Sequence, residues 1–494
     1  MATAALTGGD DASAIEFRGT WLTWGWLRGV AERLDTVLRD AGIGPGDAIG
    51  FAPLNRPECG AALLGLIAAQ RDLLMIYAYQ SPEAIGRKIA ELRCAAIIAP
   101  ADLWKEPARA AAIAAGALAV ALDGDTVTIV AGTEVDRAVE HRPAAAAPGI
   151  ALLTSGTTGA PKHFHMNYEV IGRSMVRETG LMASLVAREE VELRPAALLY
   201  FPFGNIAGIY SFLPLALARR PVLMLEKFSL HEWLDYVRRW RPTTSGLPPA
   251  AFRMLLEANI PQEDLASLRH MSTGAATLDP SVQREFEQRY GIPVLLSYGA
   301  TEFGGVVSLM TPDDQARYGA SKFGSVGRPW AGAQLRIVDP ETREPVAPGQ
   351  EGLIEVLAPR IGADWIRTTD LGMIDEDGFL YHRGRNDGAI VRGGFKIVPE
   401  PVSAALVEHP AIAAAVVVGV PDQRLGEVPV AAYELRAGAA SPSHDELEAH
   451  MRARLPATHL PVLYREVPAL PRTPSLKFDL VGVRALFAGE SQPK

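Results

Sequence analysis

The stretch GIALLTSGTTGAPK, residues 149–162, places an apolar run directly before a loop of glycines and hydroxyl-bearing residues. Residues 149–153 have the composition of a buried strand. In the loop that follows, glycines let the backbone approach an anion and point successive N–H groups at it, and the hydroxyls and Lys162 add further donors and a positive charge. The segment therefore predicts a phosphate site that follows a strand.

The spacing of this loop excludes the common P-loop class, GxxxxGK[ST]. Here Gly156 is followed by Gly159, and His163 stands where a serine or threonine would bind magnesium. The predicted phosphate site is therefore not a P-loop of this class.

Composition narrows the class of protein further. A chain of 494 residues with 48% hydrophobic and 21% charged residues is typical of a folded protein of roughly three domain-sized units. A net charge of −9 argues against nucleic acid or an anionic membrane as the main partner. Two cysteines, Cys59 and Cys94, form no disulfide framework and have no metal-ligand spacing, so we expect both in the core.

Neither a leader nor a membrane span is expected. The start, MATAALTGGDDASAIEF, carries acidic residues and lacks a long apolar core. The longest apolar runs, residues 59–69 and 110–122, fall short of the roughly 20 residues that a span requires. We expect a cytoplasmic protein.

Helix-like and strand-like segments alternate through the first part of the chain, which favours a largely parallel sheet. The expected helices are residues 21–41, 58–70, 82–92 and 230–240, and the expected strands are residues 73–77, 95–99, 196–201, 221–225 and 294–297. Short alternating strands at residues 334–338 and 352–356 then indicate a β-rich part. After residue 387 come strand, helix, strand and helix at residues 389–391, 402–408, 414–420 and 444–455.

We therefore predict an α/β protein of two domains. Residues 1–386 form a large N-terminal domain of layered α/β subdomains plus a small β-rich subdomain. Residues 387–494 form a small mobile α+β C-terminal domain.

The phosphate loop closely resembles that of the acyl-adenylate-forming superfamily, which includes acyl- and aryl-CoA ligases, adenylation domains of peptide synthetases and luciferase-like enzymes. The resemblance covers nearly the whole chain, with the motifs in the family's order. It implies that the phosphates are bound by Thr154, Ser155, Gly156, Thr157, Thr158, Gly159 and Lys162.

Two later motifs resemble the family's nucleotide site. Residues 272–276, STGAA, match the adenine-side segment with Gly274, Ala275 and Ala276, and residues 298–302, YGATE, match the YGxTE motif. The resemblance implies that Tyr298 and Gly299 adjoin adenine, that Thr301 contacts the α-phosphate, and that Glu302 helps to hold Mg²⁺. An aromatic face suits a base, and a hard oxygen suits a hard cation.

The motifs that end the large domain complete the implied site. Asp370 matches the carboxylate that accepts both ribose hydroxyls, Arg385 adds ribose and phosphate contacts, and Asp387 matches the hinge of the small domain. Lys477, in the segment PRTPSLK, matches the catalytic lysine, whose charge would lower the barrier between two anions. The thiol tunnel matches Gly393, Gly394, Phe395 and Lys396.

Four positions depart from the family pattern. Asn205 stands at a histidine position of the acyl pocket, where its amide would meet a polar group of the substrate. The segment HFHMN after the phosphate loop lacks the glycine–valine pair and the later threonine–histidine pair that are usual there. Pro401 and Ser403 replace acids at a helix start. Leu476 replaces the glycine before the catalytic lysine. By position, the acyl pocket is lined by Phe203, Asn205, Gly246, Gly274, Gly299, Ala300 and Gly305.

The resemblance implies an ATP-dependent carboxylic acid:CoA ligase that uses ATP, Mg²⁺ and coenzyme A. Such an enzyme forms an acyl-adenylate with release of pyrophosphate and then converts it to a CoA thioester. The small and aromatic lining favours an aryl or medium-sized acyl group, and the absence of aspartate from Tyr200 to Leu213 disfavours an amino acid. Two alternatives stay open: an enzyme that loads an acid onto a carrier-protein phosphopantetheine, and a non-catalytic binder of nucleotide or acyl-adenylate. A homodimer is also left open.

Overall fold

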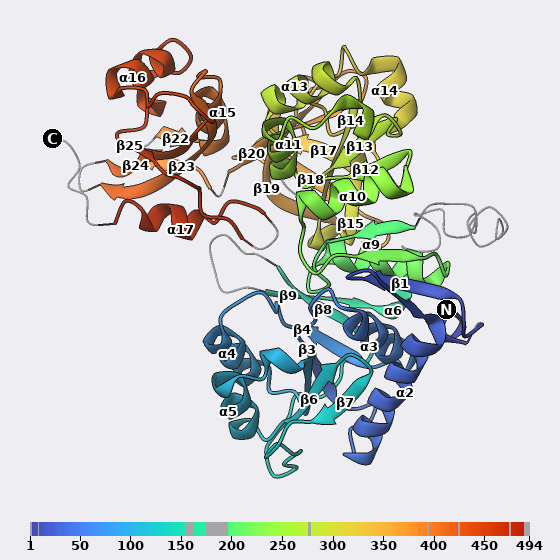
Figure 1. Cartoon of the computed structure of the whole chain (residues 1–494). Helices are drawn as coiled ribbons and strands as arrows, with labels where there is room; N and C mark the ends of the chain where they lie inside the picture. Colours follow the sequence, from blue (N-terminus) through green and yellow to red (C-terminus); the bar gives the residue numbers. More distant parts are fainter. Residues whose placement is uncertain are drawn as a thin grey trace. The chain divides into compact units, whose positions relative to one another are not determined.

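The computed structural model describes residues 2–7, 9–154, 162–173, 196–274, 278–386, 388–392, 395–422, 425–473 and 476–488. The chain divides into two compact units (Figure 1). The first contains Met1–Pro242 and Ala300–Gly305, and the second contains Thr243–Gly299 and Val306–Lys494.

A seven-stranded sheet organises the first unit, in the order β7-β6-β5-β3-β4-β8-β9. The five central strands are parallel, and β7 and β9 run antiparallel at the two edges. The α/β class is confirmed. The strands are β3 (Ala48–Phe51), β4 (Asp72–Met75), β5 (Ala96–Pro100), β6 (Leu118–Asp123), β7 (Thr126–Ile129), β8 (Gly149–Thr154) and β9 (Lys162–Asn167).

Helices cover both faces of this sheet (Figure 1). Alternate residues of a strand point to opposite faces. In β3, Ile49 and Phe51 join the core beneath α2 (Trp24–Asp40) and α3 (Pro57–Ala68), whereas Ala48 joins the core beneath α4 (Pro82–Leu92) and α5 (Glu106–Ala114). Both faces are therefore buried, as parallel strands require.

The connections of the sheet reverse direction at β3 and β5. These two strands are neighbours, but β3 leads through α3 to β4 on one side, and β5 leads through α5 to β6 on the other. Ligands of open α/β sheets commonly bind at such a switch point. Here Arg56 after β3 pairs across this point with Asp102 in η1 (Ala101–Leu103) after β5, at 2.8 and 3.0 Å.

A second sheet of the first unit has the order β10-β11-β1-β2. The expected helix 21–41 begins only at Trp24, because Thr20–Thr23 pairs with β1 as an antiparallel strand and Thr23 caps the helix through the N–H of Trp26. The remaining elements of this unit are β1 (Ser13–Phe17), β2 (Thr20–Thr23), β10 (Ala197–Leu199), β11 (Val222–Met224), α1 (Ala2–Leu6), α6 (Tyr168–Arg173), α9 (Ile206–Leu217), α10 (Leu230–Trp240) and η3 (Thr301–Phe303).

The second unit begins with the sheet β12-β13-β14-β15-β16, followed by the antiparallel sheet β17-β18-β19-β20. The latter confirms the predicted β-rich part. Their strands are β12 (Thr244–Gly246), β13 (His270–Thr273), β14 (Val294–Ala300), β15 (Gly305–Leu309), β16 (Arg328–Pro329), β17 (Gln334–Val338), β18 (Glu351–Leu357), β19 (Trp365–Ile374) and β20 (Leu380–Arg385). The helices are α11 (Pro249–Glu257), α12 (Gln262–Leu265), α13 (Pro280–Tyr290) and α14 (Pro312–Tyr318).

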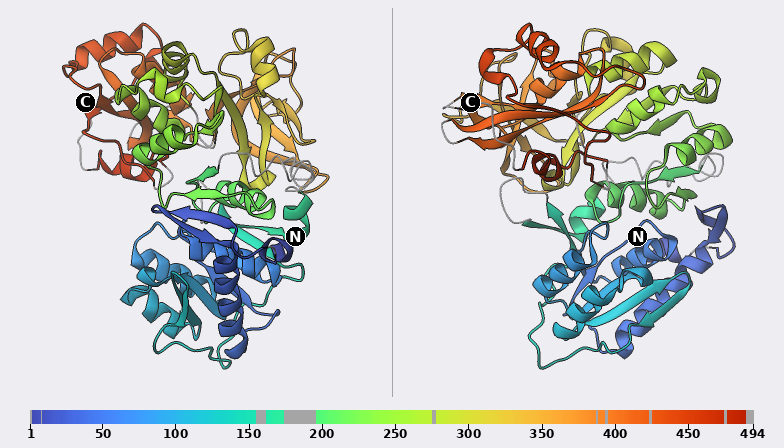
Figure 2. Two further views of the ribbon diagram at one scale, coloured as in Figure 1. Left: turned by 45° about the vertical axis from the view of Figure 1, so that its right-hand side comes forward. Right: turned by 60° about the vertical axis from the view of Figure 1, so that its left-hand side comes forward.

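The last part of the second unit is built on the long hairpin of β23 and β24, drawn in orange in Figure 2. One face of the hairpin packs under α15 and α16, and the other under α17. The elements are β21 (Ile390–Arg392), β22 (Phe395–Ile397), α15 (Pro399–Val407), β23 (Ile412–Asp422), β24 (Gly426–Leu435), α16 (His444–Arg452), η4 (Ala457–His459), β25 (Tyr464–Glu466) and α17 (Leu480–Ala485).

Ser403, which replaces an acid of the family pattern, has a structural partner here. Its hydroxyl donates to the carbonyl oxygen of Pro399 at 3.0 Å and accepts the N–H of Val417 at 3.0 Å. The hydroxyl therefore joins α15 to β23.

Candidate active site

The predicted phosphate loop connects β8 to β9, and these two strands pair with each other. The two strands are antiparallel, and Thr154 lies directly opposite Lys162. The structure therefore brings the two ends of the loop together, which the sequence did not predict. Ser155, Gly156, Thr157, Thr158 and Gly159 lie outside the described residues.

A buried carboxylate holds this strand pair to the sheet. Asp72, at the start of β4 and 3% exposed, accepts the N–H groups of Gly149 at 3.1 Å and Ala145 at 3.0 Å. His165 of β9 lies 2.9 Å from the same carboxylate. Burial alone would raise the pKa of Asp72, but the bonds to His165 and to the two N–H groups lower it below its ordinary value.

Replacement of Asp72 by asparagine should destabilise the first unit by about 2 kcal/mol at neutral pH, because a buried polar cluster loses its charge and one of its acceptors. The folded-state pKa is lowered, so the contribution of the charge is complete above the ordinary value of 3.8 and disappears as the pH falls through the folded-state pKa. Urea unfolding of Asp72→Asn and of the unchanged chain at several pH values measures this.

The exposed carboxylate Asp125 offers a matched control. Asp125→Asn should shift the urea midpoint very little at any pH. Equal midpoints for Asp72→Asn and the unchanged chain at pH 7 would contradict the anchoring role of Asp72.

The threonine and the glutamate of the YGATE segment lie in η3, within the first unit. η3 packs beside β8, the strand that leads into the phosphate loop. The side chains of Thr301 and Glu302 are half-buried. Within the described ranges no cluster of three or more histidine, cysteine or acidic side chains is placed to hold a metal. Glu302 with phosphate oxygens still fits Mg²⁺, which commonly uses one carboxylate together with substrate phosphates.

Three parallel strands of the second unit bring glycines to one edge of their sheet. β12 ends at Gly246, Gly274 follows β13, and Gly299 lies near the end of β14. A Cβ atom on Gly274 would lie 2.3 Å from Oγ of Ser297, so a larger residue here would require the Ser297 hydroxyl to move. Ala275 and Ala276 lie outside the described residues.

Tyr298, Asp370 and Arg385 form one cluster in the second unit. The Tyr298 hydroxyl donates to Asp370 at 2.5 Å, and Nε of Arg385 lies 3.7 Å from the same carboxylate. Asp370 on β19 and Arg385 on β20 are register partners, so the two strands fix this pair. Arg385 also donates to Oγ1 of Thr369 at 2.8 Å. The structure therefore brings together three residues that the motifs predicted separately.

His382 belongs to the same cluster and was missed by the sequence analysis. Its ring lies 5.6 Å from that of Tyr298, and its Nε2 lies 3.8 Å from Asp370. Burial alone would raise the pKa of Asp370, but His382, the Tyr298 hydroxyl and the charge of Arg385 lower it. Burial and the charge of Asp370 raise the pKa of Tyr298. Asp370 is therefore an ionised acceptor and Tyr298 a neutral donor at neutral pH.

Lys477 lies on an exposed turn near this cluster. The N–H of Thr473 donates to the Lys477 carbonyl at 2.7 Å, and the N–H of Leu476 donates to the Thr473 carbonyl at 2.8 Å. Partial desolvation, together with the charge of Arg385, lowers the pKa of Lys477. Leu476, which replaces the family's glycine, has a φ of 61°, in the left-handed region that favours glycine.

The residues predicted for the acyl pocket have different surroundings. Phe203 is fully buried and packs against Phe212 of α9, with ring centroids 4.9 Å apart. Asn205 is half-buried at the start of α9 and makes no side-chain capping bond. Gly305, with a φ of 114°, faces the ring of Tyr210, and Ala300 ends β14. Gly246 and Gly299 belong to the second unit.

The hinge and thiol-tunnel residues are described only in part. Asp387, Gly393 and Gly394 lie outside the described residues. Phe395 and Lys396 lie on β22, opposite Arg392 and Val391 of β21. In the part of the chain that the structure describes, no helix is long and apolar enough to cross a membrane.

Fold and site together indicate a nucleotide-dependent enzyme of the α/β class. The chain belongs to the AMP-binding enzyme family, whose sequence model matches residues 2–361, and the model of the AMP-binding enzyme C-terminal domain matches residues 402–477. The resemblance stated from the motifs is thereby confirmed.

Several relatives of this chain are named as ligases. A long-chain-fatty-acid–CoA ligase from Bacillus subtilis is 30% identical over 347 residues, which cover 66% of this chain and 59% of the relative. ScoC, a fatty acid–[acyl-carrier-protein] ligase from Streptomyces coeruleorubidus, is 27% identical over 503 residues, which cover 97% of this chain and 94% of the relative. The crystal structure of ATP-bound MatB from Rhodopseudomonas palustris covers 99% of each chain with a TM-score of 0.80 and 23% identity, and shows the same fold.

Proposed function

We propose that this chain is an ATP-dependent carboxylic acid:CoA ligase, an acid–thiol ligase that forms an acyl-adenylate and then a CoA thioester. The observation that carries the proposal is the cluster of Tyr298, Asp370 and Arg385, where an ionised carboxylate is held beside a guanidinium and an aromatic ring. An ionised carboxylate accepts both hydroxyls of a ribose, and the ring offers a face for adenine.

The first half-reaction joins the acid to the nucleotide. A carboxylate oxygen attacks the α-phosphorus of ATP, and the bond to the pyrophosphate oxygen breaks, leaving a mixed anhydride and pyrophosphate. Lys162, Thr301 and Lys477 would stabilise the charge on the phosphate oxygens, and Asp370 would hold the ribose. Mg²⁺, held through Glu302, neutralises phosphate charge when it is bound.

The second half-reaction passes the acyl group to a thiol. The sulfur attacks the acyl carbon, AMP leaves, and the thiol proton passes to solvent. In the proposed scheme, the small domain, residues 387–494, turns about Asp387, withdraws Lys477 and brings Gly393, Gly394, Phe395 and Lys396 to the reacting carbonyl. The two half-reactions then use one site in turn.

The acid is proposed to be an aryl or medium-sized acyl compound. Two relatives are named for fatty acids, which supports an apolar acyl group on a carboxylate. Asn205 is proposed to face the acid, since its half-buried amide makes no capping bond to α9. A carrier-protein phosphopantetheine is the second candidate for the acceptor, supported by the name of the relative ScoC and its nearly full coverage of this chain.

The direct test is pyrophosphate release by the purified chain with ATP, Mg²⁺ and a panel of aryl, medium-chain, dicarboxylic and amino acids. We expect release with an aryl or medium-length acid, and formation of a thioester when CoA is added. Release without a CoA thioester, together with loading of a phosphopantetheinylated carrier protein, would favour the second acceptor. Absence of release with every acid would overturn the proposal in favour of a non-catalytic binder.

Asp370→Asn should raise the KM for ATP by about tenfold or more, because two charge-assisted bonds to the ribose become neutral ones. The KM for the acid should change little. Steady-state kinetics with each substrate varied in turn measures both constants. An unchanged KM for ATP in a variant with the thermal midpoint of the unchanged chain would exclude Asp370 from the ribose site.

Lys477→Ala should slow adenylate formation by about a hundredfold, the size expected for losing one group that stabilises the developing charge. Thioester formation from a supplied acyl-adenylate should remain close to that of the unchanged chain. Single-turnover assays of each half-reaction separate the two steps, and Lys477→Arg, which keeps the charge, should retain part of the first. An equal loss in both steps would contradict the proposed withdrawal of Lys477.

A cytoplasmic location and a homodimer remain proposals. ATP and CoA are cytoplasmic substrates, which supports the first. The mass of the purified chain in solution tests the second.

A further inference from the structure

The segment of residues 201–205 carries Asn205 between β10 and α9. It is not part of a sheet, so its main-chain groups have no strand to pair with. Asn205 itself is fixed through its main chain, because its N–H donates to Pro202 at 3.0 Å and its carbonyl accepts the N–H groups of Gly208 at 3.1 Å and Ile209 at 3.2 Å. The position of the Asn205 amide therefore depends on the contacts that hold residues 201–204.

Asn55 provides that support. It follows β3 of the seven-stranded sheet and is fully buried. Its Nδ2 donates to the carbonyl of Phe201 at 2.9 Å, and its Oδ1 accepts the N–H of Phe203 at 3.0 Å. Nδ2 also lies 3.4 Å from the carbonyl of Leu225, which follows β11. The Asn55 amide therefore supplies the hydrogen bonds that a neighbouring strand would give to this segment. It also joins the ends of β10 and β11 to the end of β3.

Only a side chain with both a donor and an acceptor satisfies this arrangement. Aspartate keeps the acceptor for Phe203 but turns a second oxygen toward the carbonyls of Phe201 and Leu225. Alanine leaves all three groups without this partner, and a buried main-chain group without a bond costs about 1–3 kcal/mol.

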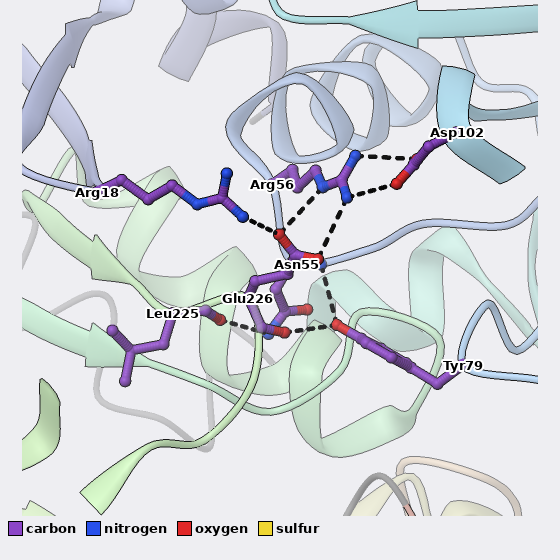
Figure 3. Close-up of polar contacts among 7 residues, drawn as sticks. All are labelled: Arg18, Asn55, Arg56, Tyr79, Asp102, Leu225 and Glu226. Carbon is purple, nitrogen blue, oxygen red and sulfur yellow. Dashed lines mark hydrogen bonds and ion pairs between the residues drawn. The ribbon is translucent and has the colours of Figure 1, made fainter. Parts of the chain in front are cut away.

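Further contacts around Asn55 join the chain beside it to Glu226, which follows β11 (Figure 3). Arg56 pairs with Glu226 through two bonds of 3.2 Å, and the Tyr79 hydroxyl donates to the Glu226 carbonyl at 2.6 Å. Arg18 binds the same carboxylate at 2.9 Å. Arg56 also pairs with Asp102, so Asn55 projects from a main chain that is fixed at the switch point of the large sheet.

We propose that Asn55 is a positioning residue for the acid: by fixing the main chain at Phe201 and Phe203, it sets where Asn205 meets the acyl group. The inference rests on the proposed function, since it assigns Asn205 to the acid. Asn55 acts through the segment and does not itself touch the reacting atoms.

The test compares Asn55→Ala and Asn55→Asp with the unchanged chain below the thermal midpoint of the weakest variant. In Asn55→Ala we expect the KM for the acid to rise about tenfold while the KM for ATP changes less than about twofold, because the proposed role of Asn55 concerns the acid alone. Asn55→Asp keeps the bond to Phe203, so its KM for the acid should lie between those of Asn55→Ala and the unchanged chain. Equal rises of both KM values, or an unchanged KM for the acid, would overturn the proposal.

Amide hydrogen exchange at Phe203 gives a readout that needs no substrate. The Phe203 N–H donates to Asn55, so its exchange should become about tenfold faster in Asn55→Ala and should change little in Asn55→Asp. Asp125→Asn, which changes an exposed carboxylate elsewhere in the first unit, is the control, and neither readout should move.

The two proposals fail in different ways. If the unchanged chain releases no pyrophosphate with any acid, the proposed function fails while Phe203 exchange still reports on the Asn55 contact. If pyrophosphate release is present but Phe203 exchange is the same in Asn55→Ala and the unchanged chain, the positioning role fails and the proposed function stands.

Discussion

Buried main-chain groups must find hydrogen-bond partners, and in the first unit two buried side chains supply partners where the sheets do not. Asp72 accepts the N–H groups at the entry to β8, and Asn55 binds the segment between β10 and α9. Each side chain lies at one end of a parallel strand, and each holds a segment proposed to contact a substrate. The strands of the sheet fix the positions of Asp72 and Asn55, and these two side chains in turn hold neighbouring segments through hydrogen bonds.

In the second unit, charged and polar side chains rather than main-chain groups surround the buried carboxylate. Asp370 is surrounded by a hydroxyl, an imidazole and a guanidinium, which together outweigh the cost of burying its charge. Because Asp370 and Arg385 are register partners on β19 and β20, their spacing is set by the strand pairing. A ribose would find an acceptor that is already ionised and oriented, so little reorganisation would accompany binding.

Much of this arrangement was predictable from local pattern, and the rest depends on contacts between distant residues. Helices 82–92 and 230–240 were predicted with their observed ends, because apolar periodicity and capping serines are local signals. The pairing of Thr154 with Lys162 was not predicted, because no local signal says which strand another will join. Tyr298, Asp370 and Arg385 were found through motifs. His382, Asn55 and Asp72 were missed, since a lone polar residue beside a strand resembles many others.

Leu476 has an energetic consequence for the segment that carries Lys477. For a residue other than glycine, a left-handed backbone costs roughly 1–2 kcal/mol, which weights an equilibrium by about five- to thirtyfold. The turn that presents Lys477 is therefore held by its surroundings against an intrinsic preference of its own backbone. A glycine at this position would adopt the same conformation without that cost, so the side chain that departs from the family pattern carries an energetic penalty directly beside Lys477.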